Sequence, residues 1–261
     1  MTTAAAPAAT LRPARRTRMT RHGFATLTRT QATLLLREPA ALVWLALPML
    51  LLLVFGNIPG FLTPQATLGG RRVIDVYVPT IAAMVPLFLA LTALPMTMAA
   101  HREKDVLRRL SASPVPATGM LAALVTVIAA LAALGVTAVV TVGALAFHVS
   151  TPANPAAVLS SFLLGATAVL ALGLLVAARA RTGTAASAMG VPLMVLNFFA
   201  SGLYFPVAQM PRLLQHVTEY IPFGAVMAAW DGRGALWQHL AVLAAYTLLA
   251  GTAAARWFRW E

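Results

Sequence analysis

Six long apolar stretches fill most of this chain, and each is close to or above the length that crosses a membrane. A helix of about 20 mostly apolar residues spans a hydrocarbon core of roughly 30 Å. None of the six holds Asp, Glu, Lys or Arg in its interior. We therefore predict an all-α polytopic membrane protein whose transmembrane helices cover about residues 40–58, 76–100, 117–147, 156–178, 185–205 and 236–255.

The composition supports a single membrane domain. Hydrophobic residues make up 60% of the chain, which leaves too little polar surface to cover a water-soluble globule of this size. The apolar runs are continuous and lack the alternation of a transmembrane β-strand, so helices that pair their own backbone groups are the expected solution. We assign residues 1–22 to a disordered basic cytoplasmic tail and residues 23–261 to the transmembrane domain.

The positive charge is distributed unequally between the two sides of the predicted membrane domain. The net charge is +12, and seven arginines precede the first span. With the N-terminus inside, fifteen of the nineteen Arg and Lys residues lie on the cytoplasmic side, which the positive-inside rule favours. Both termini are therefore expected in the cytoplasm. Such basic segments meet anionic lipid headgroups, and we expect membrane lipid and no nucleic acid as their partner.

Two segments in the N-terminal half have residue patterns that predict their local structure. Residues 24–37 place Phe24, Leu27 and Leu34 on one helical face, which predicts an amphipathic helix along the cytoplasmic headgroup layer. The second span contains Pro79, Pro86 and Pro95. Proline removes a backbone donor from a helix, so this span should be kinked or locally unwound.

The chemistry that the chain lacks excludes several functions. Without ionisable residues inside the spans, an ion-coupled carrier is disfavoured. Cysteine is absent, the five histidines are scattered, and no Gly-Lys-Ser/Thr phosphate-binding loop occurs. We expect neither a metal nor a nucleotide on this chain and no enzymatic activity of its own. Energy for uphill transport would have to come from another polypeptide.

The cytoplasmic segment after the second span is the best candidate for contacting such a partner. Val106, Leu107 and Leu110 share one helical face, and charged residues fill the remainder. We predict that Glu103 lies against the membrane domain and pairs with Arg29 or Arg37, since a lone carboxylate there would be costly. The proposed coupling segment comprises Arg102, Glu103, Lys104, Asp105, Val106, Leu107, Arg108, Arg109 and Leu110.

Two motifs carry a resemblance to a known family. The first is Arg102-Glu103-Lys104, followed by Arg109-Leu110 and Ser113-Pro114-Val115-Pro116. The second is Ser201-Gly202-Leu203-Tyr204-Phe205-Pro206, followed by Met210-Pro211 and Ile221-Pro222-Phe223. In this order and topology they resemble the ABC-2-type transporter permeases, in particular the membrane subunits of daunorubicin-resistance-type exporters. The resemblance covers about residues 24–255.

The resemblance implies a bacterial plasma-membrane subunit that dimerises and pairs with two ATP-binding subunits, which would bind ATP and Mg²⁺. Residues 102–110 would be the coupling helix, and the outer segment would form re-entrant helices marked by Gly202, Pro206, Pro211 and Pro222. The periodicity itself predicts a short amphipathic helix over Pro211–Tyr220. Asp105 replaces a glycine that is common in the family, so the local backbone there is expected to differ.

The resemblance also implies export of a substrate, and the residues that line the transport path should match that substrate in polarity. If spans two and five line the path, its walls are apolar, aromatic and slightly polar, which suits a drug, an antibiotic or a lipid-like molecule. Lipid-facing or core packing is the equal alternative for these residues: Met84, Phe88, Asn197, Phe198, Phe199 and Tyr204. A polysaccharide or lipid-linked glycan permease, an ATP-independent channel or carrier, and a non-transporting scaffold remain rival functions.

Overall fold

The structure, a computed structural model, is an elongated helical bundle and describes residues 20–103, 117–152 and 154–258. Within these residues it contains helices and no strand. The helices are α1 (Arg21–Leu36), α2 (Pro39–Gly56), α3 (Val73–Phe88), α4 (Leu94–Glu103), α6 (Ala117–Phe147), α7 (Pro155–Arg179), α8 (Gly183–Ala200), α9 (Arg212–Thr218), α10 (Pro222–Trp230) and α11 (Leu236–Trp257). Short helical turns are η1 (Pro59–Phe61), η2 (Ala66–Leu68), η3 (Leu89–Ala93) and η4 (Val207–Gln209).

The predicted all-helical membrane fold is confirmed. Five helices of the described part are long and apolar enough to cross a membrane, namely the continuous unit α3–η3–α4 together with α6, α7, α8 and α11. A sixth candidate is the pair formed by α1 and α2, which is bent by 67° at the break between Leu36 and Ala41. Predicted span one corresponds to α2, and the predicted amphipathic stretch corresponds to α1. Helix α1 begins at Arg21, slightly before the predicted boundary of the tail, because Thr20 caps it by accepting a hydrogen bond from Gly23 N at 3.1 Å.

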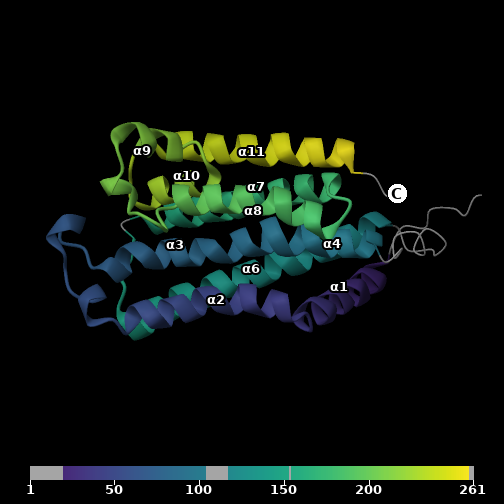
Figure 1. Cartoon of the computed structure of the whole chain (residues 1–261), viewed down its shortest axis with the longest axis horizontal. Coiled ribbons are helices and arrows are strands. Elements are labelled where there is room, and N and C mark those ends of the chain that lie inside the picture. Colours follow the sequence, from purple (N-terminus) through teal and green to yellow (C-terminus); the bar gives the residue numbers. More distant parts are fainter. Residues whose placement is uncertain (1–19, 104–116, 153, 259–261) are drawn as a thin grey trace, which may run out of the picture.

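The ends of the bundle differ in what they contain (Figure 1). One end carries η1, η2 and α9, and we call it the outer end. The opposite end carries α1, the end of α4 and the C-terminal end of α11, and we call it the inner end after the predicted orientation. Helices α2 and α11 lie on opposite sides of the bundle, and α3–η3–α4 runs between them as its most deeply buried element.

Span two departs from a regular α-helix in its middle, as its prolines predict. Residues 89–93 form a π-helical turn in which Leu94 N donates to Leu89 O. Because Leu94 N bonds Leu89 O, Ala90 O lacks its regular i+4 donor, and Pro95 has no N–H to offer Leu91 O. Inside a membrane domain, a carbonyl without its helical donor must be accommodated by neighbouring protein.

Two glycines accommodate these two carbonyls. A Cβ added to Gly173 of α7 would lie 1.9 Å from Ala90 O, and one added to Gly190 of α8 would lie 2.0 Å from Leu91 O. Close backbone approach of this kind is where weak Cα–H···O contacts form between helices. The irregular turn of span two therefore fixes how closely α7 and α8 pack against it.

Arg72 joins the start of α3 to the end of α6 at the outer end. Its guanidinium donates two hydrogen bonds of 2.8 Å to Asp75 and others to Phe147 O and His148 O, at 3.2 and 2.6 Å. Asp75 also accepts from Ser150 N at 3.0 Å. The hydrogen bond with Asp75 raises the pKa of Arg72, so the arginine stays charged. This cluster fixes spans two and three together.

Replacing Gly173 with alanine should destabilise the protein by about 3 kcal/mol, near the upper limit for overpacking, because the new methyl group meets a backbone carbonyl that cannot rotate away. The matched control is Gly251→Ala on α11, where nothing lies within 4 Å of the added Cβ. Thermal unfolding in detergent measures both. A similar midpoint for the two variants would contradict this account of the packing.

Candidate functional site

The described beginning of the coupling segment lies against the turn between α7 and α8. Arg102 donates to Ala177 O and to Ala180 O, the latter at 2.6 Å. Glu103 Oε1 accepts from Gly183 N at 3.0 Å. A cation thus lies at the C-terminal end of α7 and an anion at the N-terminal end of α8, so each charge meets the helix dipole of opposite sign.

The predicted pairing of Glu103 with Arg29 or Arg37 is wrong. Ion pairs within the described residues join Arg71 to Asp231, Arg72 to Asp75, and Arg233 to Glu219 and Asp231, all at the outer end. The physical reason is the placement of α1, which packs on α6 and α2 and so leaves α4 beside α7 and α8. Glu103 then finds its donor in the unpaired backbone N–H at the start of α8.

The C-terminal end of α11 also reaches this site. The guanidinium carbon of Arg102 lies 5.2 Å from the centroid of the Phe258 ring, within the range of a cation–π interaction. Arg102 therefore links α4, α7 and the end of α11. The sequence predicted Arg102 and Glu103 as functional residues but no role for Ala177, Ala180, Gly183 or Phe258, because backbone groups and distant contacts leave no local pattern. Residues 104–110 of the predicted coupling segment lie outside the described residues.

Four of the six predicted path residues are buried in the middle and outer part of the bundle. Phe88 of α3 meets Phe198 of α8 edge to face, with ring centroids 5.2 Å apart. Trp44 of α2, which the sequence analysis missed, stacks on Phe88 with ring centroids 4.7 Å apart. Met84 and Asn197 are also buried, whereas Phe199 is half-buried and Tyr204 is exposed. Trp44, Phe88 and Phe198 join spans one, two and five.

Asn197 has a structural contact that its sequence position did not reveal. Its side-chain oxygen accepts from Phe223 N at 3.2 Å, while its amide donates to Leu193 O at 2.9 Å. It therefore caps the first turn of α10 from α8. Close by, Thr80 of α3 donates to Ser201 O at 3.0 Å. Span two, the end of span five and α10 are thus hydrogen-bonded to one another.

The outer segment contains two helices where the periodicity predicted one. Helix α9 lies within predicted Pro211–Tyr220. Helix α10, which follows it, is almost entirely buried between α7, α8 and α11, and its uniformly apolar residues gave no amphipathic signal. Pro222 begins α10, Pro211 precedes α9, and Pro206 precedes η4. Gly202 adopts φ +84° in the turn after α8, a conformation that favours glycine.

Comparisons with known proteins place the chain in a family. The family model described as ABC-2 type transporter matches residues 22–230. Among curated proteins, a 69-residue region is 33% identical to the linearmycin resistance permease protein LnrN of Bacillus subtilis (strain 168). That region covers 26% of this chain and 18% of the relative, so the chain matches under a fifth of the relative's length. No solved structure matches the chain significantly.

Replacing Asn197 with alanine should loosen α10, because the buried Phe223 N–H loses its acceptor at a cost of about 1–3 kcal/mol. Asn57→Ala is the matched control, since Asn57 also donates to the i−4 carbonyl, of Leu53, but is exposed. Hydrogen exchange of the amides of residues 222–230 should accelerate in the first variant and not in the second. Unchanged exchange in both would show that Asn197 does not hold α10.

Proposed function

The chain belongs to the ABC-2 type transporter family, and from this premise we propose that it is the membrane subunit of an ABC exporter driven by a separate ATP-binding subunit. The observation that carries the proposal is the contact of Arg102 and Glu103 with the two helix ends of the α7–α8 turn. A push on the segment that follows Glu103 would act directly on three spans at once.

Close backbone contacts and side-chain hydrogen bonds together connect the inner end to the outer end. Helix α4 leads from Glu103 to the π-helical turn, whose carbonyls approach Gly173 and Gly190. Further along, Thr80 and Asn197 connect α3 and α8 to Ser201 and to α10. Because close-packed interiors are hard to compress and transmit strain, a displacement of α4 would also move α7, α8 and α10. We propose that spans two and five shift together and that α10 moves with them.

The proposed substrate is hydrophobic or amphiphilic: a drug, an antibiotic or a lipid-like molecule. Support comes from the aromatic and apolar residues where spans one, two and five meet, in particular Trp44, Phe88 and Phe198. The word resistance in the name of the Bacillus relative agrees with an exporter of toxic compounds. In the present arrangement these side chains pack together, so the path they would line opens only when the spans separate.

The proposed assembly contains two copies of this chain and two ATP-binding subunits, in the plasma membrane of a bacterium with both termini in the cytoplasm. ATP and Mg²⁺ would bind to the partner alone. Two copies of the chain related by a two-fold axis would enclose a central path between identical membrane domains, and such closed dimers are the commonest symmetric assemblies.

Reconstitution tests this function directly. Co-expression with its ATP-binding partner subunit should yield a stable complex, and liposomes that contain the complex should accumulate a hydrophobic antibiotic only when ATP is present. Flux through liposomes with this chain alone would indicate a channel or carrier, and a complex that moves none of a panel of antibiotics, lipids and glycans would favour a scaffold.

Glu103→Ala should reduce the substrate transported per ATP hydrolysed by severalfold, because Gly183 N loses its acceptor and the α8 dipole loses its anion. Glu103→Gln keeps an acceptor oxygen and loses only the charge, so we expect a smaller effect of about twofold. The control is Glu38→Gln, an exposed carboxylate that makes no side-chain capping bond to α2. Transport and ATP hydrolysis measured on the same liposomes give the ratio. Equal ratios in all three variants would refute the role of Glu103.

A further inference from the structure

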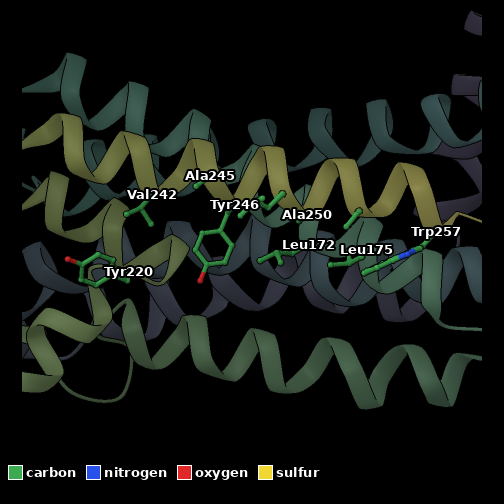
Figure 2. A pocket seen from close by; sticks show the side chains of 10 residues that line it. Leu172, Leu175, Tyr220, Val242, Ala245, Tyr246, Ala250 and Trp257 are labelled. Atoms are coloured by element: carbon green, nitrogen blue, oxygen red, sulfur yellow. The ribbon is translucent and has the colours of Figure 1, made fainter.

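An apolar groove runs along the outside of the bundle between α7 and α11. It has a volume of about 500 Å³, which falls within the usual range of roughly 300–1,000 Å³ for small-molecule sites. Leu172 and Leu175 form its α7 wall, and Val242, Tyr246 and Ala253 belong to the α11 wall. Figure 2 shows Tyr220 at one end of the groove and Trp257 at the other.

The inner end of the groove is positively charged. Arg179 stacks on the Trp257 ring, with its guanidinium carbon 4.0 Å from the ring centroid. Arg181 lies two residues after the end of α7, and Arg256 lies in the last turn of α11; both side chains are exposed. Within residues 20–103, 117–152 and 154–258, no carboxylate forms an ion pair with any of these three arginines. Stacking engages the face of the guanidinium, so its N–H edges stay available for an anion.

We propose that the inner half of this groove binds an anionic phospholipid of the cytoplasmic leaflet, with an acyl chain along α11 and the phosphate at Arg179 and Arg256. Basic pockets between transmembrane helices on the cytoplasmic side are the sites that suit anionic headgroups. The site is independent of transport and holds whether or not the chain serves an exporter.

The length of the inner half of the groove fits one leaflet. From Tyr246 to Trp257 the helix advances about 16 Å at 1.5 Å per residue, close to half of a hydrocarbon core of roughly 30 Å. Tyr220 and Trp257 close the two ends with the side chains that favour the two membrane–water interfaces. The cations lie at the inner end, and this assigns the chain to the inner leaflet.

The wall residues favour an acyl chain over a second helix. Tight helix–helix contacts in membranes use small residues that let backbones approach, and Gly165 and Gly173 of α7 are already occupied by Val226 and Ala90. Three alanines of α11 (Ala245, Ala250 and Ala253) line the groove, but the large exposed side chains of Leu249, Trp257 and Tyr220 stand beside them and keep a second backbone from approaching closely. A flexible acyl chain can fill the space between bulky side chains, and every methylene that it buries there favours binding.

Native mass spectrometry of the purified full chain, given phosphatidylglycerol and phosphatidylcholine in equal amounts, tests the proposal. The wild type should retain phosphatidylglycerol preferentially. Arg179→Gln should reduce that preference about fivefold, the effect of one arginine near an anionic surface, and Arg29→Gln, an exposed arginine of α1 at the same end, should leave it unchanged.

A second pair of variants tests the groove itself. Ala253→Phe fills it near Trp257 and should reduce the phosphatidylglycerol retained, while Ala133→Phe on the exposed face of α6 should not. An equal loss of preference in Arg179→Gln and Arg29→Gln would mean attraction to the whole inner surface and would overturn the site. Loss of a dimer in Ala253→Phe without loss of lipid would also overturn it, because the groove would then hold a second copy.

Discussion

The close approach of two glycines to two carbonyl groups of span two, which lack their regular i+4 donors, is the contact on which the remaining structure depends. No water is available in a bilayer core to bond backbone groups, so the carbonyls of Ala90 and Leu91 in the irregular turn before Pro95 have to be covered by protein. Gly173 and Gly190 cover it, and α7 and α8 are thereby brought close to the central helix. The α7–α8 turn consequently comes within reach of Arg102 and Glu103.

The charged side chains of the described residues lie at the two ends of this bundle, and each end has its own arrangement. At the inner end, single charges of α4 meet the ends of α7 and α8, where the helix dipoles supply the counter-charge. At the outer end, side-chain ion pairs such as Arg72–Asp75 join the loops to the spans. Between them, aromatic contacts and backbone approach connect the spans, so the two ends are linked through packing with no ionisable relay.

Much of the fold follows from the sequence because the bilayer makes local hydrophobicity decisive. The spans, the amphipathic α1 and the irregularity at Pro95 were predictable from apolar length, periodicity and proline chemistry. Helix α10 was missed, because a short apolar helix of nine residues gives no periodic signal and is too short to read as a span. The partner of Glu103 was mispredicted because every residue except proline has a backbone N–H, so the sequence does not show which one a helix start leaves without a partner. An arginine, in contrast, is recognisable in the sequence as a possible partner. Trp44 could have been found as the large aromatic in span one, but its contact with Phe88 depends on how the spans pack.

The most direct measurement follows the outer end while ATP acts at the inner end. The chain has no cysteine, so a single Leu213→Cys on exposed α9 can carry a bimane label in the complex with the ATP-binding subunit. The emission of the label should shift when ATP binds to the otherwise wild-type complex, and the shift should be lost in Glu103→Ala while ATP hydrolysis continues. An identical shift with and without Glu103, or none in either, would contradict transmission from the inner turn through span two.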